Sequence, residues 1–538
     1  MSLILDNNVL QLQQLQQLQQ LQQLVSLNSN LNLNIAQTIQ NKTKQPVLVD
    51  VVLGAQLGDE GKGRLIDILS PDYNIVARCN SGGNAGHKVI VDGFVYAFHL
   101  VPSGILNPNI IGIIGNGCVI NLSDLKDEIE TIQNTNPNNS STINITKRLL
   151  ISDRAHIVLD LHKEADSKRE NIKNNNPTPS AIGTTKQGMG PVYATKALRV
   201  GLRMCDLFLE YNILRNKVSN LIDELNLCLD VDVDYSSCSI DSVGVGVGVG
   251  IASGVGIASD IHNVKLYKKE QQLQYQMNYL QQYIEFYRSM VIDTIIFMNN
   301  AVKKNKKILV EGAQACLLDV DFGVYPYCTA TNCTAGSICI GLGIPPENVG
   351  TINYVMKTYC TRVGNGPFPT EQLNIIGEKL QRIGHEYGTT TGRMRRCGWL
   401  DIPMIKWAIT INGSRNAQIC ITKLDVLDTF DEIKIATKYL KILTRDGGGD
   451  GGGDGGDGGD GNTLCELEGF PASLEMLESV QVVYETFKGW NTPTTHIRNY
   501  DDLPINAQIY LSKIQQLIQV KIKWIGVGAD RYSMAIKK

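Results

Sequence analysis

The stretch VVLGAQLGDEGKGR, from Val51 to Arg64, decides the fold of this 538-residue chain. An apolar, β-branched run ends in a glycine-rich loop, and Leu65 to Leu69 then has the composition of a helix. Glycines let backbone N–H groups converge on an anion, the start of a helix adds a positive dipole end, and Lys62 adds a point charge. The stretch predicts a strand, a loop and a helix that together hold the phosphates of a nucleoside triphosphate.

The loop is not a Walker A loop, because that pattern needs a glycine at Gln56 and a hydroxyl at Gly63. Asp59 also sets it apart. A carboxylate beside a phosphate repels it unless a metal lies between them or the carboxylate acts as a base. Either role is chemical, so the loop indicates an enzyme.

Further apolar runs have the length and composition of buried strands, and polar or glycine-rich loops follow several of them. These runs are Val47–Leu53, Ile110–Ile114, Leu149–Ile151, Ile308–Val310 and Ile419–Ile421. Helical stretches such as Gln271 to Asn299 lie between them. This alternation predicts an α/β fold with its ligands at the carboxyl ends of the strands.

Composition limits the class of protein. The content of 43% hydrophobic and 19% charged residues suffices for a large core, and the net charge of −3 gives no general attraction to nucleic acid or to an anionic membrane. The 13 cysteines are scattered without a C-x-x-C pair, which favours reduced thiols and a cytoplasmic location. No basic amino-terminal leader and no apolar segment of about 18 residues is present, so we expect neither targeting nor a membrane span.

Low-complexity segments set the expected domain boundaries. Residues 1 to 46 contain Leu-Gln-Gln repeats and an Asn-rich stretch, which predict a disordered tail. Loop expansions are expected near residues 134–141, 229–259 and 446–461, the last made only of Gly and Asp. Residues 47 to 538 are therefore expected to form a single catalytic domain.

A second glycine-rich loop, NSGGNAGH, runs from Asn80 to His87. Histidine can donate a hydrogen bond or a proton to a phosphate oxygen near neutral pH. His87 taken alone is more often a structural residue, so its role depends on the rest of the pattern.

The pattern GDEGKG followed by NAGH closely resembles the adenylosuccinate synthetase family. Further family motifs follow in order: Gly183–Thr185 with Gly190–Pro191, Glu311–Gln314, Leu318–Asp321, Tyr325–Thr329, Thr390–Arg393, Gly398–Asp401 and Thr422–Asp425. The resemblance covers residues 47 to 538 apart from the expansions. It implies a large, mostly parallel central sheet with surrounding helices and smaller subdomain insertions. It also implies a GTP-dependent ligase that joins L-aspartate to IMP through 6-phosphoryl-IMP, the first committed step from IMP to AMP.

The resemblance implies catalytic roles for Asp59 and His87. Asp59 corresponds to the base that removes the N1 proton of IMP, so that the 6-oxygen attacks the γ-phosphate of GTP. His87 corresponds to the acid at the oxygen between the β- and γ-phosphates. Magnesium is expected on Asp59 and the backbone carbonyl of Gly86.

The resemblance also implies the substrate contacts. For IMP they are Asp59, Glu60, Gly61, Lys62, Asn84, Ala85, Gly86, His87, Thr185, Arg199, Gln314, Thr329 and Arg393. For aspartate they are Thr389, Thr390, Thr391, Gly392, Arg393 and Arg395, whose hydroxyls and guanidinium groups suit two carboxylates. For GTP they are Gly58, Asp59, Glu60, Gly61, Lys62, Gly63, Arg64, Gly86, His87, Arg395, Lys423, Leu424, Asp425, Gly526, Val527 and Gly528. Arg199 matches an arginine that reaches the partner's IMP, which implies a homodimer.

Asp425 carries the expected choice of nucleotide, because its carboxylate can accept hydrogen bonds from N1–H and the 2-amino group of guanine. Four positions depart from the family pattern, namely Ala315, Phe322, Met394 and Ala529. We expect local repacking there and no loss of activity.

Two other functions fit part of the pattern. A GTP-dependent switch protein would use the phosphate loop and Asp425, but it would need neither the Asp59 base nor the threonine–arginine loop. A degenerate relative that binds nucleotides only structurally is disfavoured, because every expected catalytic position is intact.

Overall fold

The computed structural model describes residues 49–91, 93–136, 144–174, 181–229, 257–388, 392–443 and 463–537. The expected disordered tail lies outside these residues, as do Thr389–Thr391 and most of the three loop expansions. Residues Leu48–Lys538 form one compact unit. In the part of the chain that the structure describes, no helix combines the length and the apolar character needed to cross a membrane.

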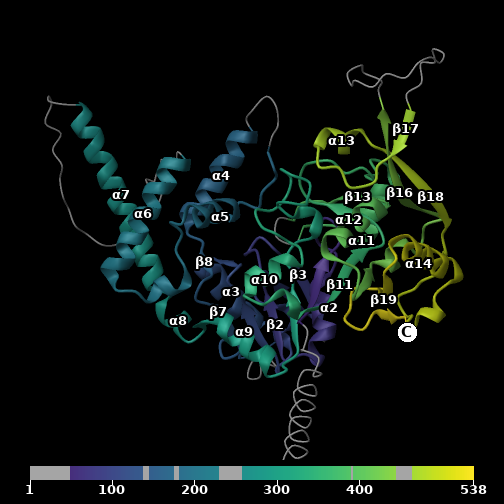
Figure 1. Ribbon diagram of the computed structural model, residues 1–538, viewed down its shortest axis with the longest axis horizontal. Coiled ribbons are helices and arrows are strands. Elements are labelled where there is room, and N and C mark those ends of the chain that lie inside the picture. Colours follow the sequence, from purple (N-terminus) through teal and green to yellow (C-terminus); the bar gives the residue numbers. More distant parts are fainter. Residues whose placement is uncertain are drawn as a thin grey trace, which may run out of the picture. The chain divides into compact units, whose positions relative to one another are not determined.

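A ten-stranded sheet forms the centre of this unit (Figure 1). Its strands, in spatial order, are β20 (Met534–Ile536), β19 (Lys521–Gly526), β15 (Ala417–Thr422), β11 (Val349–Lys357), β1 (Val49–Gly54), β10 (Ile308–Glu311), β2 (Ile75–Arg78), β5 (Ile111–Ile114), β7 (Leu149–Ser152) and β9 (Val291–Ile292). All neighbours pair in parallel except β19 and β20, which are antiparallel. The predicted α/β class with a mostly parallel sheet is confirmed, and each of the five apolar runs overlaps a strand of this sheet.

Helices and small sheets surround the central sheet. The helices are α2 (Lys62–Leu69), α3 (Leu122–Asn134), α4 (Asp160–Asn174), α5 (Met189–Leu198), α6 (Tyr211–Leu229), α7 (Ile257–Gln281), α8 (Ile284–Arg288), α9 (Thr294–Lys303), α10 (Gly336–Leu342), α11 (Ile375–Gly384), α12 (Ile402–Asn412), α13 (Leu474–Ser479) and α14 (Ile505–Ile518). The smaller sheets pair β3 (His87–Val91) with β4 (Phe94–Phe98), β6 (Val119–Ile120) with β8 (His156–Ile157), and β12 (Cys360–Arg362) with β13 (Arg396–Gly398). A four-stranded sheet contains β14 (Leu400–Asp401), β16 (Glu432–Leu443), β17 (Thr463–Glu466) and β18 (Gln481–Lys488) (Figure 1).

Burial on both faces explains why the middle of β1, from Val51 to Leu53, is apolar. Val49, Val51 and Leu53 pack in one core cluster, whereas Val52 packs in another. Because successive side chains of a strand point to opposite faces, a sheet covered on both sides favours apolar residues at successive positions.

The predicted helical stretch from Gln271 to Asn299 is not one helix. α7 ends at Gln281, α8 covers Ile284–Arg288, and β9 then pairs with β7 at the sheet edge before α9 begins. Val291 and Ile292 are β-branched and join this edge, and the Asp293 side chain accepts a hydrogen bond from the Ile296 N–H to cap α9. A helical pattern in the sequence could not reveal this pairing, because β7 lies some 140 residues away.

The topology brings six loops to one edge of the sheet. Strands β19, β15, β11, β1, β10 and β2 are consecutive neighbours and run in parallel, so their carboxyl ends share that edge. The phosphate loop follows β1, and the segment that leads to His87 follows β2. Ligands bind at this edge in open α/β sheets.

Candidate active site

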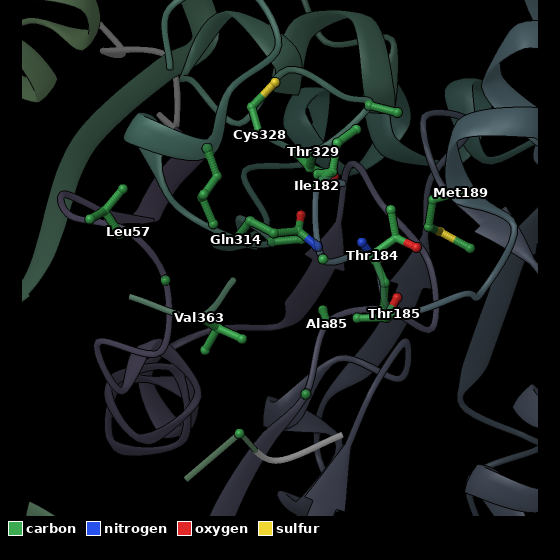
Figure 2. A pocket seen from close by; sticks show the side chains of 18 of the residues that line it. Leu57, Ala85, Ile182, Thr184, Thr185, Met189, Gln314, Cys328, Thr329 and Val363 are labelled. Atoms are coloured by element: carbon green, nitrogen blue, oxygen red, sulfur yellow. The ribbon is translucent and has the colours of Figure 1, made fainter. Parts of the chain in front are cut away.

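A cavity of about 380 Å³ lies at this edge of the sheet, lined by the loops after β1, β2 and β10 among other segments. This volume suits a small-molecule site. Twelve of the predicted site residues line it: Gly58, Asp59, Gly61, Lys62, Asn84, Ala85, Gly86, His87, Thr185, Gln314, Thr329 and Arg393. Figure 2 shows that the labelled side chains of Thr185, Gln314 and Thr329 and the methyl of Ala85 come to this space from separate segments.

The phosphate loop ends at the start of α2. Gly61, the residue before the helix, has φ 94° and offers no side chain to cap the first turn. The free N–H groups of that turn therefore remain for an anion. Lys62 begins the helix and its Nζ lies 2.7 Å from the Glu60 carboxylate.

The side chain of Glu60 stabilises this loop. Its buried carboxylate accepts hydrogen bonds from the backbone N–H groups of Gly58 at 2.8 Å and Gln56 at 3.2 Å. Glu60 does not line the cavity. The side chain of this predicted substrate residue therefore forms hydrogen bonds to its own loop.

Asp59 combines backbone strain with a charged partner. Its φ of 58° lies in the left-handed region, which costs energy for a residue other than glycine and which is common at functional sites. Arg395 Nη2 lies 2.7 Å from the Asp59 carboxylate, whose side chain is 30% exposed. The loop thus holds the carboxylate in the cavity wall with a guanidinium beside it.

His87 is held by a buried carboxylate, Glu311, for which the sequence alone predicts no role. Its Nε2 lies 3.0 Å from Glu311 Oε1, and Ser103 donates to the same carboxylate from its backbone N–H and its hydroxyl. Burial raises the pKa of Glu311, but the charges of His87 and Arg78 and the Ser103 N–H outweigh it and lower the pKa to about 2. The family motif Glu311–Gln314 contained this residue, but no spacing in the sequence pairs it with His87.

Two predicted IMP residues are joined through Ser81. Gln314 Nε2 donates to the Ser81 hydroxyl at 2.8 Å, and that hydroxyl donates to Asn84 Oδ1 at 2.6 Å. Gln314 and Ser81 both have positive φ, at 50° and 69°. The two loops are therefore fixed relative to each other.

The loop that carries Thr185 is held by two carboxylates of α4. Glu170 accepts from the backbone N–H groups of Gly183 at 2.6 Å and Thr184 at 3.2 Å, and Asp166 accepts from that of Gly188 at 3.0 Å. Arg393, from the predicted aspartate loop, donates to the Gly183 carbonyl at 2.9 Å. The walls assigned to IMP and to aspartate thus meet at Gly183.

The predicted GTP residues Lys423–Asp425 and Gly526–Gly528 lie at or just after the ends of β15 and β19 and do not line the cavity. The Thr422 hydroxyl at the end of β15 donates to the Glu60 carbonyl at 2.7 Å, which ties this strand to the phosphate loop. Asp425 Oδ1 is buried and has no hydrogen-bond partner among the residues that the structure describes, and burial raises the pKa of this carboxyl despite the opposing charge of Lys423. A buried carboxylate oxygen without a partner fits a ligand that donates N–H groups.

The remaining predicted residues are placed as follows. Arg64 donates to the carbonyls of Gly528 and Ser533, which joins α2 to the segment Gly526–Gly528 at the end of β19. Leu424 is fully buried and Gly392 has φ 65°. Arg199 is exposed at the end of α5, has φ 67°, and does not line the cavity.

Comparison with known proteins agrees with this geometry. The sequence profile of the family described as adenylosuccinate synthetase matches residues 51–243 and 257–535. An adenylosuccinate synthetase of Drosophila grimshawi is 41% identical over 500 residues, which cover 93% of this chain and 95% of that protein. The solved structure of fully ligated adenylosuccinate synthetase from Plasmodium falciparum has a TM-score of 0.74 and 38% identity, and the match covers 91% of this chain and 100% of that one. The chain therefore belongs to the adenylosuccinate synthetase family of GTP-dependent ligases that join L-aspartate to IMP.

Proposed function

We propose that Asp59 and His87 carry out the phosphoryl transfer of this ligase in the cavity. Asp59 takes the proton from N1 of IMP, and the electron pair moves to the 6-oxygen. That oxygen attacks the γ-phosphorus of GTP and forms 6-phosphoryl-IMP, while the bond to the β–γ bridging oxygen breaks and GDP leaves. The amine of aspartate then attacks C6 and expels phosphate. The observation that carries this proposal is the meeting of Asp59 and His87, from separate loops, in one cavity wall.

His87 acts at the leaving group in this proposal. Charge develops on the β–γ bridging oxygen as the bond to phosphorus breaks, and a donor placed there stabilises it. Glu311 and Ser103 lie at Nε2 of the ring, so they set its orientation. Lys62 and the first turn of α2 hold the phosphoryl group in transit.

Magnesium fits this site as a phosphate-bound ion. In the described parts of the chain, no three His, Cys, Asp or Glu side chains form a group that could hold a metal by themselves. Magnesium usually binds one or two carboxylates and completes its shell with phosphate oxygens and water. We assign it to Asp59 and the carbonyl of Gly86, where it would neutralise charge on the phosphates.

The substrate contacts follow from the positions of the loops. We assign IMP to Asn84, Thr185, Gln314 and Thr329, which supply amides and hydroxyls from four segments of the cavity wall. We assign the carboxylates of aspartate to Arg393, Arg395 and the segment Thr389–Thr391. We assign guanine to Asp425, and we assign further GTP contacts to Arg64 and the segment Gly526–Gly528.

A homodimer would complete the site with Arg199 of the partner. Arg199 is exposed, and large apolar side chains in the same part of the chain are exposed too. These are Leu198 at 44%, Leu209 at 37%, Tyr211 at 42% and Ile213 at 48%. Exposed apolar side chains in the same stretch of chain as an exposed cation support an interface between two copies of the chain.

We also propose that residues 47 to 538 act as one catalytic domain in the cytoplasm. The compact unit Leu48–Lys538 supports the first statement. Cysteines buried as small apolar side chains, such as Cys79, Cys118 and Cys420, support the second.

An isotope experiment separates the ligase from a GTP switch. IMP labelled with ¹⁸O at the 6-position is incubated with the full chain, GTP and Mg²⁺, with and without L-aspartate. The proposed chemistry transfers the label to inorganic phosphate when aspartate is present. Unlabelled phosphate, released whether or not aspartate is added, would instead show simple GTP hydrolysis.

A further inference from the structure

Glu386 is a buried carboxylate behind the active site. It lies two residues after the end of α11 and three residues before Thr389, and its side chain is 0% exposed. It does not line the cavity. A buried charge needs partners close by, because leaving it alone in the interior is costly.

Four hydrogen bonds from three side chains satisfy Glu386. Lys357 Nζ lies 3.0 and 2.9 Å from its two oxygens, and the Tyr359 hydroxyl and Arg395 Nη1 donate to it at 2.5 and 2.6 Å. Burial raises the pKa of Glu386, but the charges of Lys357, Lys423 and Arg395 outweigh it and lower the pKa to about 2. The carboxylate is therefore charged near neutral pH.

Arg395 joins this buried carboxylate to the catalytic loop. Its Nη1 contacts Glu386 while its Nη2 contacts Asp59 at 2.7 Å, so the planar guanidinium spans the two carboxylates. Its Nε is buried and has no hydrogen-bond partner in the described part of the chain. A guanidinium held by two carboxylates has little rotational freedom, and a donor remains for a ligand.

The same carboxylate is linked to the phosphate loop and to the guanine segment. The Lys357 N–H donates to Gln56 Oε1 at 2.8 Å, and Gln56 Nε2 donates to the Tyr359 carbonyl at 3.0 Å. Lys423, next to the guanine residue Asp425, donates from Nζ to the Gly384 carbonyl at 2.7 Å. Segments from the phosphate, guanine and aspartate loops therefore meet around one side chain.

We propose that Glu386 is a positioning residue that, together with Lys357, holds Arg395 in place between Asp59 and the aspartate substrate. Removal of its charge frees Arg395 to turn fully toward Asp59, and the aspartate carboxylate then loses a fixed donor. The four residues assigned to IMP above, Asn84, Thr185, Gln314 and Thr329, come from other segments, so IMP binding is spared. This inference rests on the role proposed for Arg395 in aspartate binding.

The test compares steady-state constants of Glu386→Gln, which keeps the shape and removes the charge, with those of the wild-type chain. Hydrogen bonds to charged groups are among the stronger ones, so we expect the KM for aspartate to rise roughly tenfold or more while the KM for IMP stays within about twofold. Asp401→Asn is the matched control, because Asp401 is equally buried and contacts Tyr439 outside the cavity. It is expected to leave both KM values unchanged.

Tyr359→Phe serves if Glu386→Gln does not fold, because it removes one hydrogen bond to Glu386 and no charge. It is expected to raise the aspartate KM about threefold. Equal changes in all KM values, or a lower melting temperature with an unchanged aspartate KM, would overturn the positioning role. Arg395→Gln separates a failure of the role proposed for Arg395 from a failure of the role proposed for Glu386. If it too leaves the aspartate KM unchanged, the role of Arg395 itself is wrong, whereas a rise for Arg395→Gln alone removes only the inference about Glu386.

Discussion

The imidazole of His87 occupies the space beside Gly63 in the first turn of α2. A Cβ on Gly63 would lie 2.1 Å from Cδ2 and 2.6 Å from Nε2 of that ring. Real Cβ atoms do not approach so closely, so residue 63 must be glycine while His87 is in this position. The hydroxyl that a Walker A loop carries here is absent because the proposed catalytic acid takes its place.

Gly63→Ser restores that hydroxyl and should inactivate the enzyme. The new side chain displaces the His87 ring from Glu311, and we expect kcat to fall about 100-fold or more, which is the loss typical of one catalytic donor. The measurement is the rate of adenylosuccinate formation at saturating substrates. GTP binding, followed by calorimetry, should change far less because the backbone of the loop remains.

Gly336→Ala is the control for this substitution. Gly336 also begins a helix, α10, but a Cβ there meets only Thr334 Oγ1 at 3.8 Å. Wild-type turnover is expected. A Gly63→Ser enzyme with near-normal kcat would show that the position of His87 seen here is not needed for catalysis.

Asp425→Asn should change the preferred nucleotide from GTP to XTP. Within the described ranges of the chain, the buried Oδ1 of Asp425 has no hydrogen-bond partner, which fits an acceptor for guanine. An asparagine amide presents a donor where the 2-amino group of guanine needs an acceptor, whereas the 2-oxygen of xanthine accepts from it. The ratio of kcat/KM for the two nucleotides should shift toward XTP by about 100-fold or more.

Asp428→Asn provides the comparison for this prediction, because Asp428 is close in sequence but is bound by Trp490 and Thr494. It should keep the preference for GTP. If the Asp425 variant also prefers GTP as strongly as the wild type, another residue reads the base.

Arg199 can be tested by mixing two inactive variants. Arg199→Leu removes the proposed contact with the partner's IMP, and Asp59→Ala removes the proposed base. In a mixed dimer, one site combines an intact Asp59 with an intact Arg199 of the partner subunit. Equal mixing should therefore restore about a quarter of wild-type activity.

The control for this experiment is the mixture of Asp59→Ala with His87→Ala. We propose that both of these residues act within one protomer together with its own cavity, so each site keeps one defect and activity should stay low. Activity of Arg199→Leu alone at the wild-type level, or no recovery on mixing, would argue against a shared site.

Asp401 should make the stability of the fold depend on pH. Burial raises its pKa from 3.8 to about 6, against smaller opposing effects of the hydrogen bonds from Tyr439 and the Met404 N–H. The fold therefore prefers the protonated form, and this stabilisation is complete below about pH 4 and is lost as the pH rises through 6. The loss amounts to a few kcal/mol at most, since one pKa unit corresponds to about 1.4 kcal/mol.

Asp401→Asn is neutral at every pH and keeps the acceptor that caps α12. As the pH rises from 4 to 7, its urea midpoint should increase relative to that of the wild type. The urea midpoint of Asp501→Asn, at an exposed position, should not change relative to the wild type. A constant difference between Asp401→Asn and wild type over this range would mean that Asp401 does not titrate within it.

The chain's local patterns determined much of the fold and the chemistry. β1, the phosphate loop and the start of α2 are contiguous, and the conformation of such a segment depends on glycine positions, apolar runs and helix signals within some 20 residues. The same holds for the strand that precedes Thr422–Asp425. Asp59 could be singled out because a carboxylate among phosphate-binding glycines needs a chemical reason.

Only the tertiary structure decided which side chains act together. Glu311 approaches His87, Arg395 approaches Asp59, and Lys357 approaches Glu386 across the sheet edge, although most of these partners are far apart in the chain. The side chain of Glu60 turned out to brace its own loop, and β9 interrupted a stretch with a helical composition. These contacts depend on the order of the strands, which brings distant segments to one edge, and a local pattern contains no information about that order.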